Sequence, residues 1–269
     1  MRQRSIRLLA SVAAAALLAA GLCGCQTMSD ITGSISPKAP TSADTDPRLA
    51  VDAAGERYRA DPKNAEAALA YGQALRASGQ RSQAAAMLEQ ATIAHPGDKA
   101  LLAAYGRALV DNGNFQQALD VLSRAHSPDS PDWRLLSVQG TALDQLGRHD
   151  EARRYYESAL KIVPGEPTVL SNLGLSYMLS KNLPKAEEAL RQAYASGKAD
   201  ARVRQNLALV VGLEGRFAEA ENIVRADLPP DQAAANVAYL RQMLSHKSTT
   251  PSESRAARNG AANKVSANQ

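Results

Sequence analysis

The chain has 269 residues, a formal net charge of +4 and two cysteines, both within the first 25 residues. Three arginines (Arg2, Arg4 and Arg7) lie in an N-terminal leader, so the charge falls to +1 once the leader is removed. This near-neutral balance, without a Lys/Arg run interleaved with aromatic residues, gives little support to nucleic-acid binding. The lack of any later cysteine excludes a disulfide bond in the rest of the chain.

Residues 1–25 have the features of an exported protein's signal peptide. The arginines are followed by an apolar stretch of 15 residues, Leu8 to Leu22. A membrane-spanning helix needs about 20 apolar residues, so this stretch is too short to span comfortably. We therefore expect a cleaved leader, with an uncleaved membrane anchor as the less favoured alternative.

The leader ends in Leu22-Cys23-Gly24-Cys25, which resembles the lipobox of bacterial lipoproteins. The resemblance implies that Cys25 is diacylated and becomes the mature N-terminus. Gln26 follows the cysteine, where an aspartate would favour the inner membrane, so the resemblance implies the periplasmic face of the outer membrane. An ordinary secretory signal with an incidental cysteine is the alternative.

Two polar segments flank the central part of the chain. Residues 26–47 are rich in Ser, Thr, Pro and Asp, which predicts a flexible tether. Residues 248–269 are polar and lack aromatic side chains, which predicts a disordered tail.

Between these segments, small residues recur with a period of 34. One series of glycines continues into Ala208, and it comprises Gly72, Gly106, Gly140 and Gly174. A second glycine series has Lys181 in place of one member, and it comprises Gly79, Gly113, Gly147 and Gly215. An alanine series is complete: Ala84, Ala118, Ala152, Ala186 and Ala220. A larger side chain follows each alanine four residues later: Leu88, Leu122, Tyr156, Leu190 and Val224. Two helices that approach closely need such small positions, so the pattern predicts stacked helix pairs.

This period, with a glycine or Ala208 in each first helix, an alanine in each second helix and a closing Pro96 or Pro164, resembles the tetratricopeptide repeat (TPR). We expect five repeats, at 65–98, 99–132, 133–166, 167–200 and 201–234. Residues 48–60 would add a half repeat before them, and residues 231–246 a capping helix with Asp231 as its N-cap. The predicted fold is an all-α TPR superhelical solenoid over residues 48–247.

In repeats of this kind the first helix lines a concave groove, where a protein partner binds. The positions expected to be exposed there are Arg107, Arg134, Ser137, Thr141, Ser171, Asn172, Leu175, Gln205, Asn206 and Leu209. By resemblance to peptide-binding members, Asn172 and Asn206 would bond the backbone of an extended ligand. The alternative is that these two asparagines cap or bridge adjacent helices.

No catalytic, metal-binding or cofactor-binding motif is present in the sequence. The histidines have no spacing suited to a metal ion, and no phosphate loop or nucleophile motif occurs. His149-Asp150 follows Gly147-Arg148 and is expected to begin a helix. We therefore expect no enzyme, no cofactor and no small-molecule substrate.

The last third of the repeat region carries a narrower resemblance, to the TPR lipoprotein of the Tad (tight adherence, Flp-type) pilus system. Its segments are Val169–Tyr177, Arg202–Val211, Gly215–Glu221, Asp227–Pro230 and Asn236–Leu244. The resemblance implies a pilotin-like scaffold that assists the outer-membrane secretin during pilus biogenesis. The alternative is a TPR lipoprotein that serves β-barrel assembly or a peptidoglycan enzyme.

Overall fold

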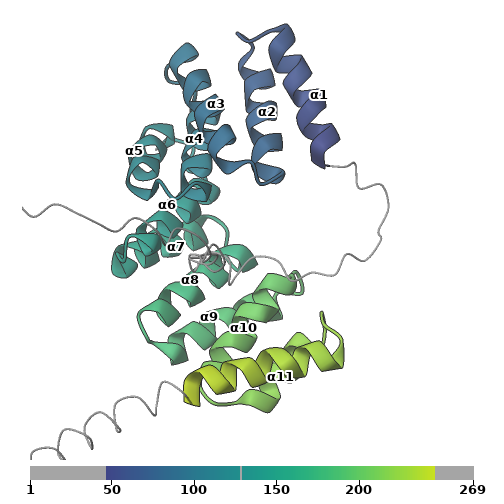
Figure 1. The fold of residues 1–269 in the computed structure, drawn as a ribbon. Coiled ribbons are helices and arrows are strands. Elements are labelled where there is room, and N and C mark those ends of the chain that lie inside the picture. The colour runs from purple at the N-terminus through teal and green to yellow at the C-terminus, as the bar shows by residue number, and fades with distance from the viewer. Residues whose placement is uncertain (1–46, 128, 246–269) are drawn as a thin grey trace, which may run out of the picture. The chain divides into compact units, whose positions relative to one another are not determined.

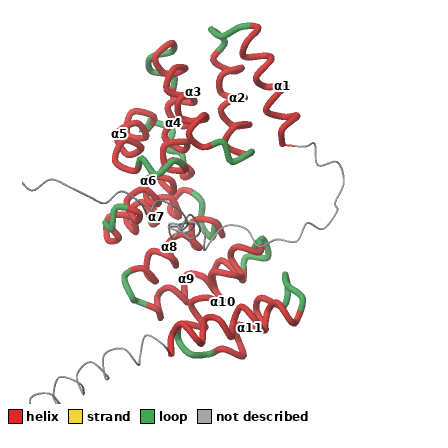
Figure 2. Tube along the Cα trace, in the orientation of Figure 1, coloured by secondary structure: helices red, strands yellow, loops and turns green. Residues whose placement is uncertain are grey.

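The computed structural model describes residues 47–127 and 129–245, which belong to one compact unit. The predicted signal peptide, its Cys25, the predicted tether up to residue 46 and the predicted tail lie outside the described residues. Within the described residues every regular element is a helix, which confirms the all-α prediction (Figure 2).

The helices follow one another in pairs along the chain (Figure 1). The first helices of the five repeats are α2 (Ala65–Ala77), α4 (Lys99–Asp111), α6 (Trp133–Gln145), α8 (Pro167–Leu179) and α10 (Ala201–Leu213). The second helices are α3 (Arg81–Ala94), α5 (Phe115–Ala125), α7 (His149–Ile162), α9 (Leu183–Ala195) and α11 (Phe217–Val224). Helix α1 (Pro47–Ala60) precedes them, and residues 230–245 form a last helix.

Each first helix begins at the residue that the 34-residue period predicts, because a polar side chain caps it one residue earlier. The capping residues are Asn64, Asp98, Asp132, Glu166 and Asp200. Asp98, for example, accepts hydrogen bonds from the backbone N–H groups of Ala100 and Leu101 at 2.9 and 3.0 Å. A cap of this kind pairs donors that the start of a helix leaves without partners. The caps therefore set the repeat boundaries.

The helix pairs stack in the manner of a solenoid. Every helix from α1 to α11 contacts the next one in the chain, and each first helix also contacts the first helix of the next repeat. Neighbouring repeats thereby bury the apolar faces that a single helix pair would leave in water.

The glycines of the first helices make this close packing possible. A Cβ atom placed on Gly72, Gly106, Gly140 or Gly174 would lie 2.5–2.6 Å from the large residue 16 positions later, which is Leu88, Leu122, Tyr156 or Leu190. In the last repeat Ala208 replaces the glycine, and the smaller Val224 replaces the leucine. Both belong to one buried cluster, so a smaller partner accommodates the added methyl group.

The turn inside each repeat requires a left-handed backbone conformation. Gly113, for example, has a φ of +84°. In the fourth repeat Lys181 adopts the same conformation with a φ of +62°, the one described non-glycine residue to do so. The turn geometry is therefore kept even where the sequence lacks the glycine that favours it.

The two predicted flanking helices are present. In α1, Tyr58 stacks on Tyr71 of α2 with ring centroids 5.8 Å apart. The last helix buries Ala233 and Val237 in the cluster it shares with α10 and α11. It begins at residue 230, because Ala233 already donates to the carbonyl of Pro229, so Asp231 lies in its first turn and not at the N-cap as predicted.

Candidate functional site

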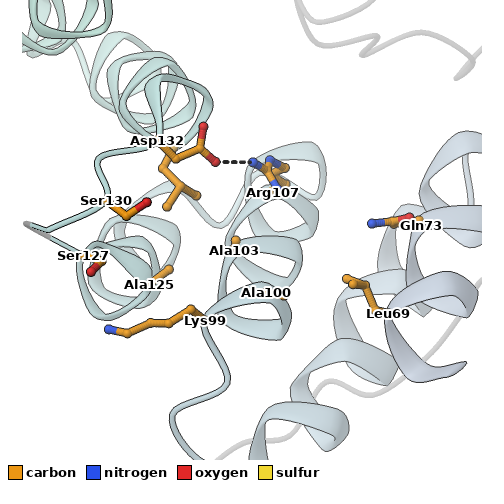
Figure 3. A pocket seen from close by; sticks show the side chains of 11 residues that line it. Leu69, Gln73, Lys99, Ala100, Ala103, Arg107, Ala125, Ser127, Ser130 and Asp132 are labelled. Carbon is orange, nitrogen blue, oxygen red and sulfur yellow. Dashed lines mark ion pairs between the residues drawn. The ribbon is translucent and has the colours of Figure 1, made fainter. Parts of the chain in front are cut away.

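Helices α2 and α4, the end of α5 and the start of α6 line an open pocket of about 410 Å³. It is lined by Leu69, Gln73, Lys99, Ala100, Ala103, Arg107, Ala125, Ser127, Ser130, Asp132 and Leu135, and we call it the α2–α6 groove. Figure 3 shows Leu69 and Gln73 projecting from one helix toward Ala100, Ala103 and Arg107 on another. The lining combines apolar side chains with polar ones, among them Gln73 and Arg107.

Arg107 is the predicted site residue that lies in this groove. Its guanidinium is 3.8 Å from a carboxylate oxygen of Asp132, the pair joined by a dashed line in Figure 3. Its side chain is 25% exposed. Burial lowers the pKa of Arg107, and the positive charges of Arg76 and Arg134 lower it further. The negative charge of Asp132 acts in the opposite direction and raises it.

Lys99 closes one side of the groove. Its amine donates to the backbone carbonyls of Arg124 and His126 at 2.5 and 3.2 Å. These bonds tie the end of α5 to the start of α4. The lysine therefore has a structural role here, and Arg107 supplies the available positive charge.

Three of the predicted exposed residues are in fact buried. Ser137, Ser171 and Asn206 are 5%, 2% and 5% exposed. The expectation that these side chains face a groove is wrong for them, because adjacent first helices pack directly over those positions.

The two predicted asparagines bridge neighbouring first helices. Asn172 of α8 donates its side-chain amide to the hydroxyl of Ser137 on α6 at 3.1 Å. Asn206 of α10 donates to the hydroxyl of Ser171 on α8 at 2.9 Å, one repeat further on. These bonds fit the helix-bridging alternative stated above. Asn172 remains half-buried, whereas Asn206 is not accessible to a ligand.

The other candidates stay at the surface of the first helices. Arg134 is exposed, and its guanidinium lies 4.5 Å from the centre of the Trp133 ring. The remaining ones are half-buried: Thr141, Leu175, Gln205 and Leu209. Thr141 donates to the carbonyl of Ser137 within its own helix, at 3.1 Å. Ligand binding by these residues stays a prediction.

Sequence reasoning missed most of the groove lining. Leu69 and Ala103 lie 34 residues apart, in the series that leads to Ser137 and Ser171. Gln73 precedes Arg107 in the same way. Extending the period backward from Ser137 finds Ala103 and Leu69, and extending it backward from Arg107 finds Gln73.

A polar network lies inside repeats three and four. The carboxylate of Asp144 accepts from Ser176 Oγ at 2.7 Å and from Tyr156 Oη at 3.0 Å, and it lies 2.9 Å from His149 Nδ1. His149 begins α7 as predicted. Ser176 is fully buried, Tyr156 is 1% exposed and the His149 side chain is 26% exposed, so the network joins α6, α7 and α8 with only its imidazole reaching the surface. Burial and the Asp144 carboxylate raise the pKa of Tyr156.

Two further observations concern residues 47–127 and 129–245 alone. No group of three His, Cys, Asp or Glu side chains there could hold a metal ion. None of the helices in these ranges combines the length and the apolar character needed to cross a bilayer.

Two family models match the chain, and both describe the tetratricopeptide repeat. They cover residues 75–139 and 137–201. Neither is an enzyme family, and proteins with this repeat are in general scaffolds that bind other proteins. No curated protein sequence matches the chain significantly.

Several solved structures share the fold. The crystal structure of PilW, a widely conserved type IV pilus biogenesis factor, has a TM-score of 0.63 at 18% identity, over 71% of this chain and 90% of that one. A thermophilic TPR protein of Thermus thermophilus has a TM-score of 0.58 at 23% identity, over 66% of this chain and all of that one.

A third structure is the APC/C hetero-tetramer Cut9–Hcn1, with a TM-score of 0.62 at 17% identity. That match covers 76% of this chain but only 40% of the matched chain. At these identities the likenesses establish the fold. Residues 75–201 are tetratricopeptide repeats, and the described part of the chain is an all-α TPR solenoid that serves as a protein-interaction scaffold.

Proposed function

We propose that this protein is an outer-membrane lipoprotein that assists Tad/Flp pilus biogenesis as a pilotin-like scaffold for the secretin. The lipid on Cys25 would hold the chain at the periplasmic face of the outer membrane, and the α2–α6 groove would bind a segment of the secretin. The observation that carries the proposal is the presence, in one chain, of a lipobox-like sequence and a TPR surface with a groove.

The two features support each other physically. A single acyl chain binds a membrane only marginally, whereas two or more chains anchor a protein stably. Anchoring both partners at one membrane makes their encounter nearly intramolecular, and effective concentrations on the order of mM then compensate for a modest affinity. With both partners at one membrane, a persistent interaction does not require a high affinity of the groove itself.

Two resemblances favour the pilus system over other outer-membrane assemblies. The segments Arg202–Val211 and Asn236–Leu244 resemble the Tad lipoprotein. PilW, whose fold this chain shares, is a type IV pilus biogenesis factor. The likeness to PilW supports a role in pilus biogenesis, and it does not identify the secretin as the partner.

The proposal predicts that Cys25→Ser releases the protein from the outer membrane and removes secretin multimers from it. A strain that lacks the gene would be complemented with the unchanged chain or with Cys25→Ser. Its membranes would be fractionated, and secretin multimers would be detected on a denaturing gel that preserves them. Cys23→Ser is the matched control and should behave as the unchanged chain, since Leu22 precedes Cys23 where the lipobox needs a small residue.

A Cys25→Ser protein that still sediments with the outer membrane would contradict the lipid anchor. Unchanged, correctly located multimers in the strain without the gene would contradict the pilotin-like role. In that case, crosslinking to β-barrel assembly proteins or to peptidoglycan enzymes would test the alternative scaffold function.

A further inference from the structure

Arg107 is a half-buried cation whose hydrogen-bonding capacity is almost unused. A guanidinium has five N–H donors in a fixed planar arrangement. Among the described residues, the Arg107 guanidinium has no hydrogen-bond partner, and its one ion pair, with Asp132, is long at 3.8 Å. Other half-buried arginines are better paired: Arg76 lies 2.6 Å from Asp111, and Arg204 bonds both oxygens of Asp227.

The charged side chains that line the groove are two cations, Lys99 and Arg107, and one carboxylate, Asp132, so the lining is positive overall. Arg134 and Arg76 also act on Arg107 as like charges, and Arg76 is itself paired with Asp111. Asp132 also has a second interaction: its other carboxylate oxygen caps α6 by accepting from the backbone N–H of Arg134 at 2.8 Å. A negatively charged ligand would therefore relieve this repulsion and pair with a guanidinium already partly shielded from water. Such charge-assisted bonds are roughly twice as strong as neutral ones.

The rest of the groove indicates what accompanies that negative charge. Leu69, Ala100 and Ala103 give an apolar surface beside Arg107, which suits an aliphatic side chain. Gln73, exposed on the opposite side, carries an amide that can bond a peptide backbone (Figure 3). A carboxylate flanked by apolar groups on an extended backbone matches these three features.

The positions that follow Arg107 at the 34-residue period change from polar to apolar. Thr141 is next, and Leu175 and Leu209 come after it, each half-buried on its first helix. Arg107 thus lies within a continuing row of surface positions and not at its end. This favours a segment that passes along the first helices over a chain terminus that stops at the arginine.

We propose that the α2–α6 groove binds an extended peptide segment of a partner protein through an acidic side chain, Asp or Glu, that pairs with Arg107. Apolar side chains of the peptide, lying toward α8 and α10 from its acidic residue, would contact Leu175 and Leu209. This inference rests on the proposed function, which places partner binding in the groove. It adds the chemistry of the segment that binds there.

The test is a selection of random peptides on the purified full chain, in a display format that fuses the C-terminus of each peptide to its carrier. Only side-chain carboxylates are then available. We expect Asp or Glu to be enriched at one fixed position, with Leu, Ile, Val or Phe enriched to one side of it. The same selection on Arg107→Glu should enrich Lys or Arg at that position.

The selected peptide, labelled with fluorescein and amidated at its C-terminus, then gives the effect on affinity by fluorescence anisotropy. Arg107→Gln should weaken its binding by about tenfold or more, the usual range for a hydrogen bond to a charged group. Arg154→Ala removes an exposed arginine of α7 outside the groove and should leave the affinity unchanged. Thermal unfolding of each variant establishes that it is folded.

A selection without enriched acidic residues, including one that yields no binder, would overturn the inference. So would equal binding by the unchanged chain and a folded Arg107→Gln, or binding that depends on a free C-terminal carboxylate. These results are independent of the secretin. If the purified chain binds an acidic peptide through Arg107, but secretin multimers are unchanged in the strain that lacks the gene, the pilus role alone is contradicted.

Discussion

Asp144→Ala is expected to destabilise the solenoid strongly. The carboxylate side chain is 7% exposed and holds Tyr156 of α7 and Ser176 of α8. Both hydroxyl donors are buried, and without the carboxylate each keeps only one longer contact: Tyr156 to the Thr141 hydroxyl at 3.4 Å and Ser176 to the carbonyl of His149 at 3.5 Å. Losing the better acceptor costs about 1–3 kcal/mol for each hydroxyl. The free energy of unfolding should therefore fall by roughly 2–5 kcal/mol, measured by urea denaturation followed by circular dichroism.

Two comparisons isolate the cause of that loss. Asp144→Asn keeps an oxygen acceptor and should lose less stability than Asp144→Ala. Asp120→Ala changes an exposed aspartate of α5 and should stay within about 0.5 kcal/mol of the unchanged chain. If Asp144→Ala unfolds at the same urea concentration as Asp120→Ala, the network does not hold repeats three and four together.

Gly106→Ala is expected to destabilise the chain although alanine is the better helix former. The new Cβ would lie 2.5 Å from both Cγ and Cδ2 of Leu122, which is itself fully buried. Overpacking a core usually costs about 1–3 kcal/mol, and the gain in helix propensity returns at most about 1 kcal/mol. The net loss of unfolding free energy should be about 1–2 kcal/mol in the same denaturation experiment.

The last repeat supplies the compensating change. Gly106→Ala combined with Leu122→Val reproduces the pair that Ala208 and Val224 form there. The double variant should be more stable than the sum of the two single losses predicts, with a coupling of about 1 kcal/mol or more. Strictly additive losses would show that the glycine and the leucine do not restrict each other.

The repeat boundaries could be predicted because each depends on local chemistry. Asp98, Asp132 and Asp200 each stand one residue before a first helix, so each period of the sequence corresponds to one cap in the structure. Tyr156 opposite Gly140 follows the same logic of small and large residues. The last helix is the exception, since its first turn starts at residue 230 and not after Asp231.

The groove could be predicted only in part, because exposure on a first helix depends on the neighbouring repeat. Asn206 stands at the same repeat position as Asn172, yet it is 5% exposed while Asn172 is half-buried. The long, weak pairing of Arg107 with Asp132 also depends on how the turn before α6 is placed, which no pattern within one helix reveals. Periodicity thus found the correct helices, and packing between repeats decided which of their residues reach a ligand.

Site-specific photocrosslinking from the groove tests the central claim most directly. A p-benzoylphenylalanine at Gln73, which lies across the groove from Arg107, should crosslink to the secretin in cells that produce the full chain. The same group at Glu157, exposed on α7 outside the groove, should not. Arg107→Glu should reduce the product from position 73. A secretin product of equal yield from both positions, or none from position 73, would contradict the account.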